Sequence, residues 1–82
     1  MPGYHLTEIP KGEIGEVSKI LEETLEVVDA SKQNCKIMVL VELSDLVGAI
    51  ELYLERHHPN LTIHDLQSMS EITQRAFKAG ER

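Results

Sequence analysis

The chain has 82 residues, enough for one small domain but too few to enclose two separate hydrophobic cores. Hydrophobic residues make up 41% of the sequence and charged residues 27%, a balance typical of a folded globular domain and not of a disordered chain. Fourteen acidic residues against eight basic ones give a formal net charge of −6, so we expect no sequence-independent binding of nucleic acid.

The cysteine count and the hydropathy pattern exclude further classes. Cys35 is the single cysteine, which rules out an internal disulfide and a zinc site built from cysteines. The most apolar stretch, residues 37–54, carries Glu42, Asp45 and Glu51 and does not have the pattern of a membrane span. There is also no basic-then-apolar leader. We therefore expect a cytoplasmic protein (in the host cytoplasm if the gene is viral) with no membrane partner.

The first elements in chain order are an extended lead-in and a helix. Residues 1–11 are mixed in character and interrupted by Pro10, which predicts an extended segment. A first helix is predicted over about residues 13–31, where apolar residues recur at three- and four-residue steps. These are Ile14, Val17, Leu21, Leu25 and Val28.

Two more helices follow. The second is predicted over about residues 36–57, closed by Pro59, because proline disfavours helix in the residue before it. The third is predicted over about residues 62–79, with Thr62 as its N-cap and Gly80 just beyond its last turn. No segment has the pattern of a strand, so the sequence predicts an all-α domain.

The predicted second helix is apolar around nearly its whole circumference. A helix of this kind must be buried on all sides, and two neighbouring helices from one short chain cannot cover it completely. We therefore predict a single domain over residues 1–82 whose three-helix protomers form a four-helix-bundle-type homodimer or homotetramer. The alternative is that part of this apolar surface is simply exposed to solvent.

Two pairs of acidic residues share a three-residue step. Glu42 and Asp45 lie within the apolar helix, where a carboxylate without a partner is costly. Glu23 and Glu26 repeat the step in the first helix, next to Glu22. Residues three apart project from one helix face. If the two helices pack antiparallel, as a short connection favours, the two pairs face each other.

Four carboxylates that face one another need a positive charge between them. Two like charges ~4 Å apart repel by about 4 kcal/mol at an effective dielectric of 20, so several such pairs rival the ~5–15 kcal/mol stability of a domain. Lys19 and Lys36 are the basic residues near these segments. Mg²⁺, with Mn²⁺ as a substitute, fits better because hard divalent ions take oxygen ligands. The alternative for Glu22, Glu23 and Glu26 is a solvated acidic helix face.

The acidic residues form a motif that resembles a known family. Residues 21–26, Leu-Glu-Glu-Thr-Leu-Glu, followed by residues 42–45, Glu-Leu-Ser-Asp, resemble the EExxE…ExxD signature of MazG-like all-α nucleoside triphosphate pyrophosphohydrolases. The likeness covers roughly residues 12–55. Residues 4–12 and 69–77 are also similar to the small single-domain branch encoded by some viruses, which includes enzymes that prefer guanine nucleotides.

The resemblance implies a reaction and a metal site. Family members hydrolyse an NTP or dNTP between its α and β phosphates, giving the monophosphate and pyrophosphate, and they act as dimers or tetramers. The likeness implies that Glu23, Glu26, Glu42 and Asp45 bind Mg²⁺, and that Glu22 or Glu23 orients or deprotonates the attacking water. The alternatives are a related enzyme for phosphoribosyl-ATP, dUTP or dCTP, and a non-catalytic helical module whose acids bind an ion or a basic partner.

The remaining candidates concern the substrate. A triphosphate needs positive groups at its distal phosphates, and we expect Lys19, Arg75 and Lys78 to supply them. The alternative for Arg75 and Lys78 is favourable charge at the end of the third helix. For the base, Tyr4 and His5 in the lead-in are the candidates. With an aromatic content of 4%, we expect recognition by hydrogen bonds more than by stacking.

Overall fold

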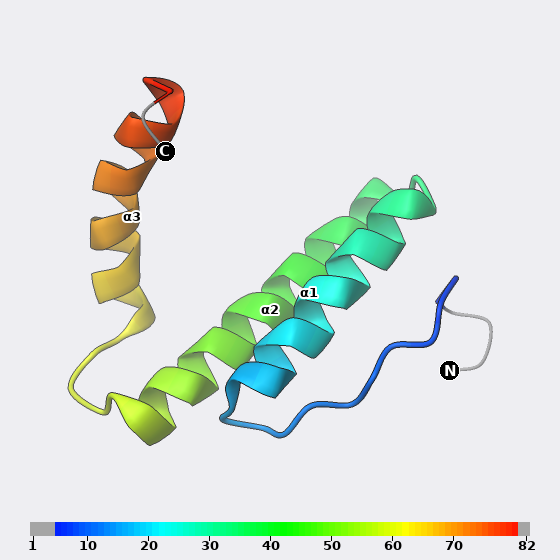
Figure 1. The fold of residues 1–82 in the computed structure, drawn as a ribbon, viewed down its shortest axis with the longest axis horizontal. Helices are drawn as coiled ribbons and strands as arrows, with labels where there is room; N and C mark the ends of the chain where they lie inside the picture. The colour runs from blue at the N-terminus through cyan, green and yellow to red at the C-terminus, as the bar shows by residue number, and fades with distance from the viewer. Residues whose placement is uncertain (1–4, 81–82) are drawn as a thin grey trace.

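The computed structural model describes residues 5–80, which form three α-helices preceded by an extended segment (Figure 1). The helices are α1 (Val17–Lys32), α2 (Lys36–His57) and α3 (Ile63–Lys78). No strand occurs between residues 5 and 80, so the predicted all-α class is confirmed. Within the same range, no helix combines the length and the apolar character needed to cross a membrane.

Helix α1 begins at Val17, later than the start near residue 13 that the apolar pattern predicts. The reason is Gly15, whose φ of 86° lies in the left-handed region that ends regular helix. A Cβ at this position would also lie 2.9 Å from Cδ of Arg56. The chain makes a turn here instead, in which the N–H of Glu16 donates to the carbonyl of Glu13 (3.0 Å). Arg56 Nη1 lies 3.2 Å from the carboxylate of Glu13 and 3.1 Å from that of Glu16.

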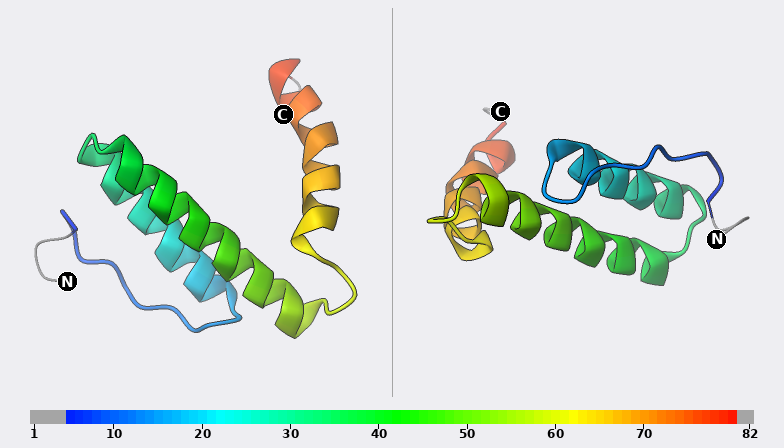
Figure 2. Two further views of the ribbon diagram at one scale, coloured as in Figure 1. Left: turned by 180° about the vertical axis from the view of Figure 1, so that it is seen from behind. Right: turned by 90° about the horizontal axis from the view of Figure 1, so that it is seen from below.

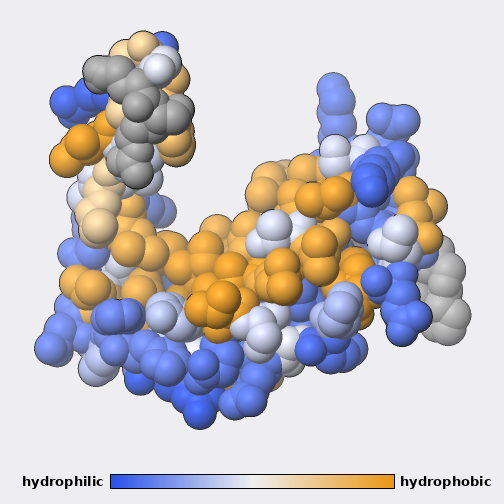
Figure 3. Space-filling view, in the orientation of Figure 1, coloured by the Kyte–Doolittle hydropathy of each residue, from blue (hydrophilic) through white to orange (hydrophobic). Residues whose placement is uncertain are grey.

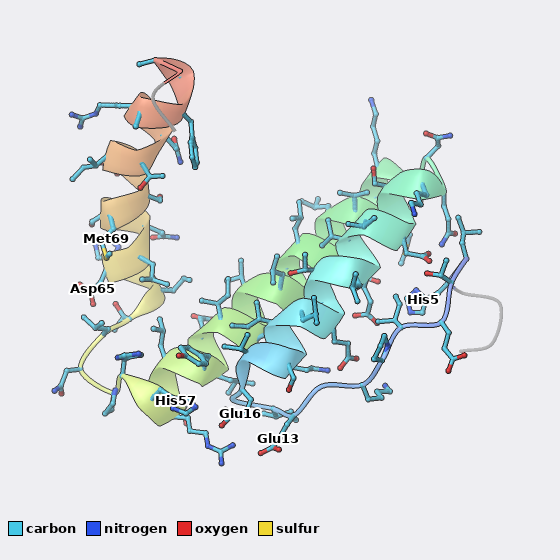
Figure 4. The ribbon with its side chains drawn as sticks, in the orientation of Figure 1. His5, Glu13, Glu16, His57, Asp65 and Met69 are labelled. Carbon is cyan, nitrogen blue, oxygen red and sulfur yellow. The ribbon has the colours of Figure 1, made fainter. Side chains whose placement is uncertain are left out.

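Helices α1 and α2 pack as an antiparallel hairpin and lie side by side in every view (Figure 2). The connection between them is short, and Asn34 turns the chain with a φ of 57°, a conformation that Asn adopts more readily than most residues. At the opposite end, Nε2 of His57 lies 3.0 Å from Oε2 of Glu16 (Figure 4). The ring of His57 also packs against Tyr53, with 4.7 Å between centroids. Both ends of the hairpin are thus fixed, which sets the register of the two helices.

Helix α3 projects away from the hairpin and contacts α2 but not α1 (Figure 1). Its start is a capping box, because the N–H of Thr62 donates to Asp65 (2.8 Å) and the N–H of Asp65 donates to the Thr62 hydroxyl (3.4 Å). The predicted N-cap is therefore confirmed. The radius of gyration, 14.4 Å, exceeds the about 12 Å typical of a compact chain of this length. One chain alone leaves α3 largely uncovered.

Few apolar side chains are buried by a single chain. In the described range the buried apolar residues are Ala30, Ala49 and Leu54, whereas Ile37 and Leu40 of α2 remain 75% and 69% exposed. Figure 3 displays this apolar surface along the α1–α2 hairpin and toward the base of α3. The chain therefore does not by itself bury the helix whose sequence calls for burial on all sides, and the homo-oligomer stays a prediction. Other large exposed apolar residues are Leu6, Ile14, Val17, Leu21, Val28, Val41, Leu43, Val47, Leu52, Leu61, Met69, Ile72 and Phe77.

Candidate metal centre

Five carboxylates from α1 and α2 come together where the two helices face each other. We call them the acid cluster: Glu22, Glu23, Glu26, Glu42 and Asp45. Carboxylate oxygens of the three α1 residues lie within 4.8 Å of one another, and so do those of Glu23, Glu42 and Asp45. Glu23 belongs to both groups and joins the two motifs. The predicted approach of the two acidic pairs is confirmed, while their roles as ligands remain predictions.

The acid cluster is largely shielded from solvent. Glu22, Glu23 and Glu42 are buried, Glu26 is partly buried, and Asp45 is exposed, so the cluster is open to solvent on the Asp45 side. Burial is the largest cause that raises the pKa of Glu26, to about 8. A hydrogen bond with Glu23 and the negative charges of its neighbours act in the same direction. At neutral pH the Glu26 carboxyl therefore retains a proton unless a cation takes its place.

Lys19, a predicted phosphate contact, lies beside the acid cluster. Its Nζ is 3.3 Å from Oε1 of Glu22 and 3.7 Å from Oε2 of Glu23. Burial would lower the pKa of Lys19, but the hydrogen bond to Glu22 and the surrounding carboxylates outweigh burial and raise it. Lys19 thus stays charged and supplies a cation that could turn from the carboxylates to a phosphate.

Glu22 has a second set of donors. The backbone N–H of Gly12 donates to its Oε1 (2.8 Å), and Nζ of Lys11 lies 3.9 Å from its Oε2. The Gly12 hydrogen bond is the main cause that lowers the pKa of Glu22, with smaller contributions from Lys19 and Lys11, and together they outweigh burial. Glu22 therefore connects the acid cluster to the segment that precedes α1.

We call residues 5–12 the strap, because this segment is anchored to α1 at both of its ends. One anchor is Gly12 on Glu22. The other is Asp29, whose Oδ2 accepts the N–H of Leu6 (2.7 Å) and the N–H of Thr7 (3.0 Å). Burial would raise the pKa of Asp29, but these hydrogen bonds and one from Gln33 (2.6 Å) lower it.

Sequence reasoning missed Asp29. The available signal was its position three residues after Glu26, which continues the step of Glu23 and Glu26 along one face of the helix. That spacing predicts that Asp29 lies on the same face of α1 as Glu23 and Glu26. It does not predict what Asp29 binds, because its partners are mainly backbone N–H groups of the strap.

Of the other predicted substrate contacts, the structure brings one to the acid cluster. His5 lies at the edge of the acid cluster, with Nε2 3.2 Å from Oε1 of Glu26 (Figure 4). Tyr4 is outside the described residues. Arg75 and Lys78 are exposed on α3, which does not contact α1, so a single chain does not bring them to the acid cluster.

The acid cluster has the donor chemistry of a hard divalent cation site. Its candidate ligand atoms are all carboxylate oxygens, close enough to share an ion, and Glu42 and Asp45 project from α2. The nearby Lys11 and Lys19 offset part of the negative charge of five carboxylates. Burial, the hydrogen bond with Glu23 and the negative charge that remains together raise the pKa of Glu26. The residues therefore fit Mg²⁺ or Mn²⁺.

Comparisons of the chain with protein-family models, with curated proteins and with solved structures found no match. The features that bear on function are therefore those of the chain itself. They are the order and spacing of the two acidic motifs and the short distances between their carboxylates in the folded chain.

Proposed function

We propose that the protein is a Mg²⁺-dependent nucleoside triphosphate pyrophosphohydrolase, which converts an NTP or dNTP to the monophosphate and pyrophosphate. The observation that carries the proposal is the position of Glu23, within 4.8 Å of acidic groups from both α1 and α2. These same residues make up the EExxE…ExxD pattern, so the motif and the geometry point to the same carboxylates. Guanine nucleotides are the first substrates to test, because the likeness to the small viral branch favours them.

Glu23, Glu26, Glu42 and Asp45 would hold Mg²⁺, or Mn²⁺ in its place. The bound ion would supply Lewis-acid activation of water and of the phosphate chain. The protein's own contribution is preorganisation, because helix packing holds the buried carboxylates in place before substrate binds. The lowered pKa of Glu22 makes it a weak proton acceptor, which favours orienting the attacking water over deprotonating it.

The reaction balances without a further reactant. Water adds to the α-phosphorus, the bond from that phosphorus to the α–β bridging oxygen breaks, and pyrophosphate leaves with that oxygen. The proton that the water loses passes to pyrophosphate or to solvent. Lys19 would contact the phosphates from its place beside the acid cluster. Arg75 and Lys78 would have to reach them from a second copy of the chain, because α3 of the same copy does not contact α1.

We propose a homodimer or homotetramer as the active form. The exposed apolar residues of α2, such as Ile37 and Leu40, are numerous for so short a chain. Exposed apolar patches of this extent usually mark an interaction surface. A second hairpin packed on this face would complete a four-helix bundle.

The test is a substrate panel with matched variants. Purified protein is incubated with each common NTP and dNTP and with phosphoribosyl-ATP, in Mg²⁺ or Mn²⁺, and pyrophosphate is detected as phosphate after added pyrophosphatase. We expect release by the wild type and by Glu71→Gln, an exposed acid on α3, but not by Glu23→Gln. If no compound yields pyrophosphate while Mn²⁺ still raises the melting temperature, the non-catalytic metal-binding module is the better description.

A further inference from the structure

Asp29 is a buried acidic residue that the proposed metal site does not use. Its exposed fraction is 2%, a degree of burial that charged residues rarely reach without strong partners. Two of those partners are the backbone N–H groups of Leu6 and Thr7, from the far end of the strap. Asp29 lies about one helical turn beyond Glu26, so the strap is anchored immediately next to the acid cluster.

The other anchor requires glycine at position 12. A Cβ there would overlap the backbone of Ser18, so no other residue allows the strap to approach α1 so closely. Glu22 and Asp29, which hold the two ends, are two helical turns apart, or about 10 Å along α1. The strap therefore runs alongside α1 past Glu26, and Figure 2 displays it beside that helix.

The Asp29 anchor fixes the position of His5. His5 immediately precedes Leu6, and its Nε2 lies 3.2 Å from Glu26 while its Nδ1 lies 3.8 Å from Asp29. The side chain is 23% exposed, so part of the ring remains accessible to a ligand next to the acid cluster. If the N–H groups of Leu6 and Thr7 were released from Asp29, the backbone that carries the His5 ring would no longer be held in place.

We infer that Asp29 is a positioning residue, which holds the strap so that His5 contacts the nucleoside part of the substrate beside the acid cluster. The inference rests on the proposed function. A contact of His5 with the nucleoside does not include the reacting phosphorus or the breaking bond, so it stabilises the bound substrate and the transition state equally. Its loss raises KM and leaves kcat nearly unchanged.

The kinetic test compares the wild type with Asp29→Ala, Asp29→Asn and His5→Ala, with Glu71→Gln as the control. For Asp29→Ala we expect KM to rise about tenfold while kcat stays within about twofold. Asp29→Asn should show a smaller rise, because its amide oxygen can still accept the strap N–H groups. His5→Ala should reproduce the rise in KM, and the double variant should not add to it, because both changes act through one contact.

A second measurement does not depend on activity. Amide hydrogen exchange at Leu6 and Thr7 should accelerate in Asp29→Ala and stay slow in His5→Ala. If the wild type turns over substrate and Asp29→Ala loses this protection with an unchanged KM, the positioning role is wrong and the proposed function stands. Protection retained in Asp29→Ala overturns the anchor itself. A wild type that cleaves no nucleotide overturns the proposed function and the positioning role with it, while the exchange data still decide the anchor.

Discussion

The raised pKa of Glu26 predicts that the protein without divalent cations loses stability as pH rises. The carboxyl ionises near pH 4.5 in an unfolded chain and near pH 8 in the folded one. Between these values the unfolded state releases a proton that the folded state keeps, so unfolding is favoured at higher pH. Each unit of pH in this interval lowers the free energy of unfolding by up to about 1.4 kcal/mol, which amounts to on the order of 5 kcal/mol across the interval.

A loss of that size is comparable with the whole stability of a small domain, so it is measurable. Urea denaturation in EDTA, from pH 5 to pH 8.5, would compare the wild type with Glu26→Gln and with the control Glu71→Gln. Gln does not ionise, so the difference between wild type and Glu26→Gln separates the proton that Glu26 and its neighbouring carboxylates hold from the histidines, which both proteins share. Asp29 does not affect this comparison. Because its pKa is lowered, the stability that its ionised form provides is lost only when the pH falls below about 4, outside the range of the assay.

Divalent cations should reverse the loss. If Mg²⁺ binds the acid cluster, at pH 8 it should take the place of the proton and restore stability, whereas at pH 5 it should compete with the proton and have a small effect. The reasoning is refuted if Glu26→Gln and the wild type follow the same pH profile in EDTA. A wild type that gains stability relative to Glu26→Gln between pH 5 and pH 8 would refute it equally.

Three further predictions follow from other parts of the molecule. Asp45→Asn should lower kcat/KM for pyrophosphate release by roughly 100-fold and remove the increase in melting temperature that Mn²⁺ causes in the wild type. Gly12→Ala should push the strap off α1, because the new Cβ overlaps the backbone of Ser18, and limited proteolysis between residues 5 and 12 should accelerate. Leu40→Glu should give monomers by light scattering at concentrations where the wild type associates, because burying each Leu side chain contributes about 1.5–3 kcal/mol.

Each of these has an outcome that contradicts it. Full turnover by Asp45→Asn at saturating Mg²⁺ would remove Asp45 from the ligand set. Unchanged proteolysis of Gly12→Ala would mean that the strap tolerates a side chain against α1. A wild type that is itself monomeric at high concentration would show that the apolar face of α2 is not a contact between copies.

The hairpin and the meeting of its acids could be predicted from the sequence because both depend on local periodicity. The three-residue step of Glu42 and Asp45 fixes one face of a helix, and Pro59 fixes where α2 must end. A short connection then leaves antiparallel packing as the simplest arrangement. From these constraints alone, the convergence of the two acidic pairs follows without knowledge of any long-range contact.

The features that could not be predicted depend on contacts between distant residues. Gly15 interrupts the helical pattern with a left-handed φ, and the side chain that lies beside it, Arg56, comes from the far end of α2. The role of Asp29 could not be predicted from a motif, because its partners are backbone N–H groups. Every residue except proline has such a group, so the sequence does not mark which ones donate to Asp29. The direction of α3 is equally hidden, since the helix buries none of its residues within one chain.

The strap is held by main-chain groups at Leu6, Thr7 and Gly12, with a supporting hydroxyl from Thr7. Packing of the strap on α1 therefore requires a backbone N–H donor at each of these three positions, so proline, which has none, cannot replace any of them. Between them, the side chains of Glu8 and Pro10 are exposed and can be exchanged without disturbing attachment, whereas Ile9 is partly buried and Nζ of Lys11 lies 3.9 Å from Glu22. A designer could thus vary these two exposed side chains to alter which ligands the protein prefers while its scaffold stays the same.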